Sequence, residues 1–378
     1  ANSMAQLAVS TSSTLAEKVL MSEIFSKQVG LLNPLEQSGM IGVGKNYVVQ
    51  VLNAELDKGG DQITYHRRNK LTGPGHDEGD PKEGFEQAIA FHDDSVKVSS
   101  KEFTARVSLV MDDQRTLLDM VDETMDALQV QVSEWKAWVV ITYLAGKVGT
   151  NVQILPTGFT GWAGNSLTDV DSTHLMYGGN ATAKADVDSA DTMVFTDFVR
   201  LKDKAMTLTY KIPQVKVKGR NLNVVLIHPN VYRDLRTSAA TQSMYDMDKA
   251  QLQGGQDPMT NQLVTAAAGI INGCLIIVCE QCPIYTDYGA GSNVRASRVL
   301  FLGPQAAVWA MGRKAQKVEW VFEKKTFEYN SEVGICARTI GGCKAVIFNS
   351  ERSAMIAMDV ATLFLMIRRP PRPTRGPR

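Results

Sequence analysis

The sequence predicts an α+β fold, with strand-like segments, one long helix and a mixed α/β region in succession. Two segments with the alternating pattern of strands flank a glycine- and proline-rich stretch at 71–81, and a segment with a helical apolar stripe covers 112–147. Strand and helix patterns then follow one another at about 190–312. With 378 residues, 44% hydrophobic and 21% charged, the chain can bury a large core divided into two or three subdomains.

A long hairpin is predicted between residues 61 and 110. The segments 61–71 and 88–98 alternate between apolar and polar residues, and a third alternating segment follows at 103–110. One face of this third segment carries the apolar side chains of Phe103, Ala105, Val107 and Leu109. The stretch between the first two segments, LTGPGHDEGDP, is interrupted by glycines and prolines, which predicts a long exposed loop.

This loop gathers side chains that could bind a metal or transfer protons, namely His76, Asp77, Glu78 and Asp80. Their order does not fit the spacing of a calcium-binding loop. On the return strand His92, Asp93 and Asp94 are consecutive, so neighbouring side chains point to opposite faces. Three interpretations stay open at this point: a metal or acid–base site, a solvated acidic loop, and a loop that touches a neighbouring subunit.

Residues 112–147 give the strongest local pattern and predict one long helix. Asp112 is placed to cap its first turn, and Asp113 suits the positive end of the helix dipole. The apolar stripe, at spacings of three and four residues, consists of Leu117, Val121, Met125, Leu128, Val132, Trp135 and Val139. At ~1.5 Å per residue such a helix would be about 50 Å long, and we expect it to be a structural spine.

The second half of the chain predicts a long loop followed by a mixed α/β region. Residues 148–190 are rich in Gly, Thr, Asn and Asp, as loops are. Helical and buried-strand patterns alternate from 191 to about 312, and 316–348 returns to strands. His228 precedes Pro229 at a strand–helix junction, where it could cap the helix or act as a general base. No nucleophile motif accompanies this histidine.

The stretch GMIGVGKN at 39–46 nearly matches a phosphate-binding loop. Gly39, Gly44 and Lys45 have the required spacing, but Asn46 replaces the serine or threonine that would hold magnesium. The motif also needs a buried strand before it and a helix after it, and neither pattern is clear here. A flexible connector is therefore the favoured interpretation.

The five cysteines are interpreted as free thiols in a reducing environment. Cys274, Cys279 and Cys282 have the spacing of an iron–sulfur site. The first two of these bracket the apolar run LIIV on a predicted strand, where alternation points them to opposite faces. Burial as small apolar residues is thus favoured over ligation, and no cofactor is expected.

The formal net charge of zero hides an uneven distribution. The segment 366–378 carries five arginines, four prolines and no acidic residue, so it lacks the apolar pattern of a folded element. Without these five, the 40 basic residues fall to 35 against 40 acidic ones. We therefore exclude this segment from the predicted fold, with nucleic-acid binding as the alternative for a short basic run. No apolar run reaches the length of a membrane span.

Several segments, in order, resemble the N-four-like major capsid proteins of tailed bacteriophages. The extended-loop signature of that family corresponds to Leu71, Gly73, Gly75, Glu83, Gly84 and Glu86. The start of its spine helix is similar to MDDQRTLLDM, through Gln114, Arg115 and Thr116. Similar segments follow at 174–183, 224–237, 298–312 and 318–349, so the resemblance covers about residues 40–350.

The resemblance implies the Hong-Kong-ninety-seven-like capsid fold and a division of the chain into six parts. These are an N-terminal arm (1–50), an extended loop with flanking strands (51–110), a peripheral domain with the spine helix and a long loop (111–190), an axial domain (191–315), return strands of the peripheral domain (316–350) and a C-terminal tail outside the fold (351–378).

The implied function is structural: self-assembly into an icosahedral phage head that encloses double-stranded DNA. The expected partners are copies of the chain as hexamers and pentamers, scaffold, portal or decoration proteins, and DNA bound without sequence specificity. The expected location is the virion, after assembly in the host cytoplasm. No catalytic residue, cofactor or metal is expected, and the loop is expected to lie over an adjacent subunit. The contact candidates are Leu71, Gly73, Gly75, Asp77, Glu78, Asp80, Glu83 and Glu86.

Two alternatives are kept. One is the shell protein of a cellular nanocompartment, which can share the implied fold. The other is a metal-dependent hydrolase that uses His76 and the acidic residues beside it.

Overall fold

A computed structural model describes most of the chain, and the statements below concern the residues that it describes. These are residues 24–29, 33–52, 60–68, 71, 73–79, 82–84, 86–108, 119–156, 158–217, 220–237, 270–312 and 319–362.

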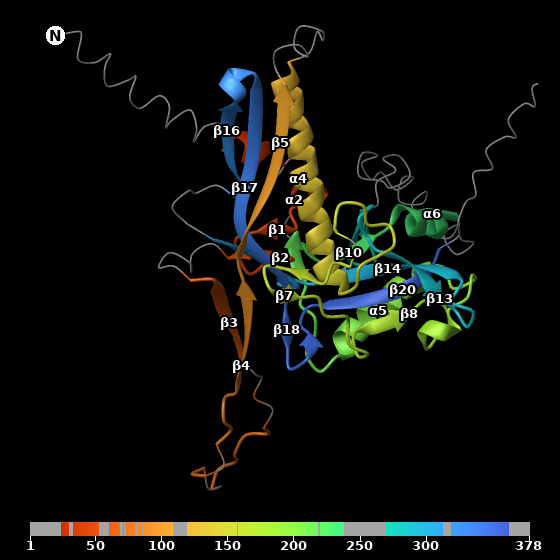
Figure 1. The fold of residues 1–378 in the computed structure, drawn as a ribbon. Coiled ribbons are helices and arrows are strands. Elements are labelled where there is room, and N and C mark those ends of the chain that lie inside the picture. The colour runs from red at the N-terminus through yellow and green to blue at the C-terminus, as the bar shows by residue number, and fades with distance from the viewer. Residues whose placement is uncertain are drawn as a thin grey trace, which may run out of the picture.

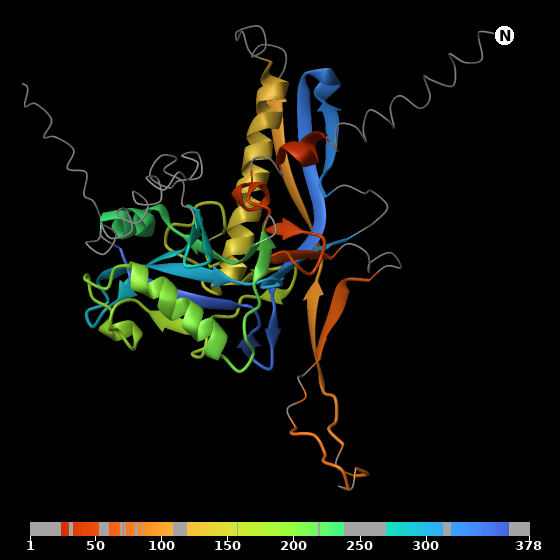
Figure 2. The ribbon, with the colours of Figure 1, turned by 180° about the vertical axis from the view of Figure 1, so that it is seen from behind.

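The predicted hairpin is present as a two-stranded arm. Strand β3 (Gln62–Arg68) pairs antiparallel with β4 (Phe91–Lys97), with His66 opposite Asp93. These two strands pair only with each other among the described strands. Figure 1 shows the arm and its loop projecting away from the rest of the molecule, and Figure 2 shows the same from behind.

A six-stranded sheet continues from the arm. Its order is β1 (Ile41–Gly42), β2 (Val49–Leu52), β15 (Ala307–Met311), β17 (Glu332–Ala345) and β16 (Val321–Phe327), and β5 (Ser99–Ser108) also pairs with β17. The predicted strand face is confirmed for its described members. Phe103 on β5 packs against Trp135 and Trp320 at ring-centroid distances of 5.4 and 6.0 Å. Leu109 lies outside the described residues.

The predicted spine is helix α4 (Met120–Ala145), which lies along β5 and β17. Its N-cap is Asp119, whose side chain accepts from the backbone N–H groups of Val121 and Asp122. The described helix thus begins later than expected, and the cap expected at Asp112 lies outside the described residues. The helix ends at Gly146, which has the left-handed backbone (φ 76°) that glycine adopts readily. Its 26 residues span about 39 Å, shorter than expected.

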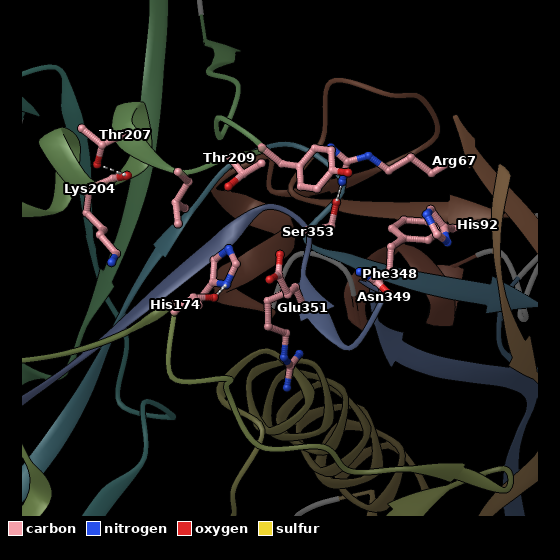
Figure 3. A pocket seen from close by; sticks show the side chains of 14 residues that line it. Arg67, His92, His174, Lys204, Thr207, Thr209, Phe348, Asn349, Glu351 and Ser353 are labelled. Carbon is pink, nitrogen blue, oxygen red and sulfur yellow. Dashed lines mark hydrogen bonds between the residues drawn. The ribbon is translucent and has the colours of Figure 1, made fainter. Parts of the chain in front are cut away.

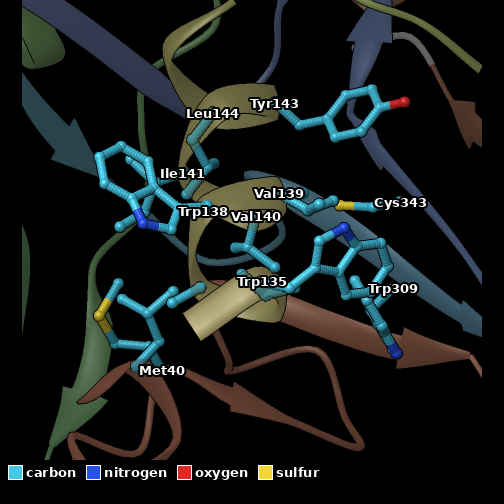
Figure 4. Packing of buried hydrophobic residues seen from close by; sticks show 14 of the residues in the cluster. Met40, Trp135, Trp138, Val139, Val140, Ile141, Tyr143, Leu144, Trp309 and Cys343 are labelled. Carbon is cyan, nitrogen blue, oxygen red and sulfur yellow. The ribbon is translucent and has the colours of Figure 1, made fainter. Parts of the chain in front are cut away.

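The C-terminal half of α4 is buried on all sides rather than along one stripe. Every residue from Trp135 to Ala145 is buried. Figure 4 shows why: side chains leave the helix in all directions and meet Met40, Trp309 and Cys343 from other elements. Burial of each large apolar side chain contributes about 1.5–3 kcal/mol, so this half of the helix anchors the core.

The predicted α/β region contains an eight-stranded sheet. Its main order is β11 (Ile270–Ile271), β12 (Cys274–Val278), β10 (Arg220–Ile227), β14 (Val294–Leu302), β20 (Met355–Ala361) and β8 (Leu175–Tyr177). In addition, β13 (Ile284–Tyr288) pairs with β14, and β9 (Val215–Val217) pairs with β10. Helices α5 (Phe195–Thr207) and α6 (Pro229–Thr237) pack on one face, and the other face joins the core around α4.

The assignment of 351–378 to a tail outside the fold is wrong for residues 351–362. Strand β20 is buried along its whole length and pairs with both β14 and β8. Its sequence, MIAMDVA, is the apolar run of a strand covered on both faces. The predicted boundary therefore came too early, and residues 363–378 lie outside the described residues.

Short elements complete the described fold. They are α2 (Pro34–Gln37), the hairpins β6 (Gly161–Trp162)–β7 (Asn165–Ser166) and β18 (Ile347–Phe348)–β19 (Glu351–Arg352), and the 3-10 turns η2 (Lys184–Asp186) and η5 (Glu328–Asn330). Among the described residues, no helix has the length and apolar character needed to cross a membrane.

Candidate functional site: the extended arm and its base

The loop that joins β3 to β4 exposes nearly all the residues singled out from the sequence. Leu71 keeps 52% of its surface exposed, and the loop residues 73–79, 82–84 and 86–90 are all exposed. The expected contact residues Gly73, Gly75, Asp77, Glu78, Glu83 and Glu86 belong to these segments, whereas Asp80 lies outside the described residues. The loop is thus not part of the chain's own core.

Local polar contacts shape the loop. The backbone N–H of Gly73 donates to Gln87 Oε1 at 2.9 Å, and that of Gly84 donates to Glu86 Oε2 at 2.8 Å. A Cβ at residue 73 would meet only the end of the exposed Gln87 side chain, which could move aside. The loop conformation therefore comes from its own strands and turns rather than from packing on the body.

The loop carries a strong excess of negative charge. Its described residues between 73 and 90 include four carboxylates and one lysine. Among the described residues, no three His, Cys, Asp or Glu side chains come together as a metal-binding group. His76, Asp77 and Glu78 therefore lie at the surface without the converging geometry that a metal site requires.

The acidic residues of the return strand separate as the alternation predicts. Asp93 points to the outer face, where its Oδ1 lies 2.6 Å from His66 Nδ1. Asp94 points to the inner face, accepts from Tyr65 Oη at 2.8 Å and pairs with Lys344. Burial, reinforced by Asp94, raises the pKa of Tyr65. Asp94 therefore holds the arm to β17 and is not free to bind a ligand.

A side-chain amide fixes the junction between β4 and β5. Asn165 Oδ1 accepts from the Lys97 backbone N–H, and its Nδ2 donates to the Lys97 carbonyl, both at 2.8 Å. This pair of bonds imitates a strand partner. A Cβ at Gly342 would clash with the same carbonyl, so glycine permits the close approach. The junction sets the direction in which the arm leaves the body.

Arg67 holds the base of the arm against the α/β region. Its guanidinium donates to Ser353 Oγ and lies over the rings of Tyr210 and Phe348 at 5.4 and 5.7 Å. Figure 3 shows these groups beside a cavity of about 200 Å³. Other residues that line the cavity include His92, His174, Lys204 and Glu351. It marks where the arm, the β18–β19 hairpin and the end of α5 meet.

The other sequence motifs have structural roles. Asn46 of the phosphate-loop-like stretch exchanges two hydrogen bonds with the Lys216 backbone, at 2.9 and 3.1 Å. Short strands and turns surround this stretch, so the strand–loop–helix context of a nucleotide site is missing. The stretch links the six-stranded sheet to β9.

The three closely spaced cysteines are free and buried, and only Cys279 and Cys282 approach each other, through a hydrogen bond between their thiols. Cys274 packs in the core beneath α5 and α6, whereas Cys279 and Cys282 pack in the core around α4. The prediction of buried thiols on different faces is confirmed. Burial raises the pKa of the Cys274 thiol to about 11.

His228 caps helix α6. Its Nδ1 accepts from the Asn230 backbone N–H at 3.1 Å, as an N-cap side chain does. Burial, together with the nearby Arg295 charge, lowers the pKa of His228 to about 4. The sequence left open whether His228 caps the helix or acts as a general base, and the geometry shows the cap.

Sequence reasoning missed the residues that attach the arm. Arg67, Asn165 and Lys344 bind partners 68 or more positions away along the chain. Each is a common polar residue with no local pattern that marks its role. Only the pairing of the strands, which the sequence does not specify residue by residue, could have shown these contacts.

Comparison with known proteins identifies one family. A family model described as phage capsid protein matches residues 7–362. No curated protein matches the chain.

Among solved structures, the chain is similar to the capsid of Ralstonia phage GP4, with 29% identity, 87% of this chain and 91% of that chain covered, and a TM-score of 0.76. It shares its fold with the capsid asymmetric unit of cyanophage Pam1 (17% identity, 86% and 91% covered, TM-score 0.70). It also shares its fold with the acid-stable capsid of Helicobacter pylori bacteriophage KHP30, with 12% identity, 86% of this chain and 91% of that chain covered, and a TM-score of 0.64.

Proposed function

This chain belongs to the phage capsid protein family, and from this premise we propose that its copies, as hexamers and pentamers, close into an icosahedral head around double-stranded DNA. It is a structural major capsid protein, and its place is the virion. The family match over residues 7–362 favours a phage head over the nanocompartment shell that the sequence left open. The observation that carries the proposal is the extended arm, which the chain holds rigidly at its base and exposes at its tip.

The base of the arm supports a role in contacts between copies. Arg67, Asp94 and Asn165 fix its direction, so the loop is presented at a defined place and not as a loose tether. A preorganised contact avoids part of the entropy cost of binding. A shell repeats each contact many times, so a modest individual contact is sufficient.

The charge of the loop indicates what it touches. Four carboxylates against one lysine make a loop–loop contact repulsive, so the loop is expected to cross onto the body of an adjacent copy. The contact residues of this proposal are Leu71, Gly73, Gly75, Asp77, Glu78, Asp80, Glu83 and Glu86.

The finer assignments belong to the same proposal. The order of arm, spine helix, α/β region and return strands supports a Hong-Kong-ninety-seven-like fold of the N-four-like group, with the domain division given above for residues 1–350. Scaffold, portal or decoration proteins would be further partners, and assembly would take place in the host cytoplasm. The domain assignments of three strands change, since β8 and β20 lie within the eight-stranded sheet of the axial part and β15 lies within the six-stranded sheet.

A structural role without catalysis fits the site. The carboxylates of the loop are spread along an exposed turn, and those of β4 are engaged with His66, Tyr65 and Lys344. We propose no reaction for His76 and its neighbours.

The test is assembly of the purified chain. Light scattering and negative-stain microscopy across salt and protein concentration should show hexamers, pentamers or closed shells. A monomer under every condition, also after mixing with scaffold protein, would contradict the proposal.

A further inference from the structure

The turn between β12 and β13 carries two cysteines three positions apart, in the sequence CEQC. Cys279 follows β12 directly, and the Cys282 backbone N–H donates to the Cys279 carbonyl at 3.3 Å, which closes a β-turn. The Cα atoms at the two ends of a β-turn lie less than about 7 Å apart. A disulfide needs a Cα separation of about 4.4–6.8 Å. The backbone therefore already holds the two residues close enough for a disulfide.

The two thiols of this turn contact each other and differ in their acidity. A hydrogen bond joins them, and the Cys279 sulfur also accepts from the Gln281 backbone N–H. The bond with Cys282 lowers the pKa of the Cys279 thiol, whereas the same bond, together with burial, raises the pKa of the Cys282 thiol. The thiolate is the nucleophilic form of cysteine. Of the two sulfurs, that of Cys279 is thus the one suited to attack a reagent.

A side-chain amide from the loop after α4 fixes the backbone of the turn. Asn151 Nδ2 donates to the carbonyls of Glu280 and Cys282, at 3.3 and 3.0 Å. Asn151 Oδ1 accepts from the Ile284 backbone N–H at 3.0 Å. None of these bonds involves a thiol, so they can all remain when the two sulfurs join. Formation of the disulfide therefore needs rotation of the two cysteine side chains and no unfolding of the turn.

The pair of thiols lies directly beneath the surface of the molecule. Cys279 and Cys282 keep only 2% and 0% of their surface in solvent, whereas Glu280 is exposed and Gln281 is half-buried. Gln281 Oε1 accepts from the Cys279 thiol at 2.8 Å, so this side chain shields the more acidic sulfur. Rotation of the Gln281 side chain would uncover that sulfur without movement of the backbone. Such a narrow route admits a small oxidant and excludes a bulky one.

We propose that Cys279 and Cys282 form a thiol–disulfide site that hydrogen peroxide oxidises after entering past Gln281. The Cys279 thiolate attacks one peroxide oxygen and the O–O bond breaks, which gives a sulfenic acid and a hydroxide that takes up the Cys279 proton. The Cys282 sulfur then attacks the Cys279 sulfur. The S–S bond forms, the S–O bond breaks, and the hydroxyl group leaves with the Cys282 proton as water.

The two steps balance. The two thiols together lose two electrons and two protons, and one peroxide is reduced to two molecules of water. A dithiol reductant would reverse the change by thiol–disulfide exchange. The proposal concerns a single copy of the chain and does not depend on the function proposed above.

Peroxide treatment of the folded, full-length chain at neutral pH tests the site. The number of free thiols should fall from five to three, because two of the five free cysteines react. Peptide mass spectrometry without reduction should place the loss of two hydrogen atoms within residues 279–282, and a dithiol should restore all five thiols. Five thiols that persist until urea unfolds the chain, or a disulfide between other cysteines, would overturn the proposal.

Single variants test the role of each side chain. Cys282→Ser lacks the resolving sulfur and should stop at the Cys279 sulfenic acid, which dimedone traps. Cys279→Ser should lose no thiol at the same peroxide concentration, whereas Cys274→Ser, the matched control in the other core, should form the disulfide as the parent does. Gln281→Ala should form it several-fold faster.

Each variant can also contradict the assignment. Dimedone labelling of Cys282 in the Cys279→Ser variant would overturn the order of attack, and an unchanged rate in Gln281→Ala would overturn the route past that side chain. Because the parent chain alone reports the bond, the site is tested even where a serine variant does not fold.

Discussion

Two aspartates bind the same buried arginine from different surroundings. Arg298 on β14 donates to Asp359 through Nε and Nη2, at 2.8 and 2.9 Å, and to Asp169 and the last carbonyl of α4 through Nη1. Asp359 is fully buried, whereas the side chain of Asp169 is 57% exposed. This arginine ties the spine helix to the eight-stranded sheet.

The two aspartates should therefore differ in their effect on stability. Asp359→Ala leaves a buried cation without its partner and should lower the free energy of unfolding by about 3–5 kcal/mol. Asp169→Ala removes an exposed partner of the same cation and should cost about 1 kcal/mol or less. Urea denaturation measures both. Equal losses would mean that burial does not govern this network.

His228 gives the stability a pH dependence whose sign follows from its pKa. The folded-state pKa of about 4 lies below the ordinary value of 6.5, so between these pH values the unfolded chain binds a proton that the folded chain does not. This group contributes its full stabilisation above pH 6.5, and the contribution decreases as the pH falls toward 4.

His228→Asn tests this dependence without removing the cap. Asparagine accepts the same N-cap bond but does not titrate. Between pH 6.5 and 4 the Tm of the parent should fall more steeply than that of the variant. Parallel Tm profiles would show that His228 titrates alike in the folded and unfolded chains.

At the scale of elements, the sequence predicted the type and buried face of a helix or strand better than its first and last residues. The face of β5 that carries Phe103, the burial of Cys274 and Cys279 on different faces, and the long helix all followed from side-chain periodicity. The first residue of that helix could not be predicted in this way, since Asp112 and Asp119 are equally good N-cap residues in the sequence. Strand β20 was missed because a run of seven apolar-rich residues beside an arginine-rich segment looks like the edge of a tail.

The corrected boundary predicts where the chain can be cut. Truncation after Leu365, before the Arg- and Pro-rich stretch, should leave the Tm unchanged. Truncation after Arg352 removes β20, which pairs with β14 and β8, and should abolish cooperative unfolding. Thermal melts of both proteins provide the measurement. A drop of several degrees in the longer protein would place the stretch within the folded body.

The extended loop should matter for assembly and not for folding. Shortening residues 72–86 to a tight turn removes few core contacts, and loop closure changes by only ~0.6 kcal/mol per halving of length. The variant should melt near the parent temperature and form no regular shells. A Gly/Ser loop of equal length is the control that separates reach from side-chain contacts. Normal shells from the shortened chain would show that the loop is not needed for contacts between copies.

The whole molecule is an elongated unit with a different exposed element at each end. The acidic loop lies at one end and the tip of the β16–β17 hairpin at the other, and the core around α4 joins them. The sequence could indicate the loop, because its glycines and charges are local. It could not indicate the conformation of the tip, because the positive φ angles of Glu328 and Tyr329 have no marker such as glycine in the local sequence.

The most direct measurement is a cryo-electron microscopy reconstruction of the particles that the purified chain forms. The account predicts a closed shell in which residues 71–86 of each copy lie across the body of an adjacent copy. A shell in which the loop folds back on its own chain, or a preparation without closed shells, would contradict it.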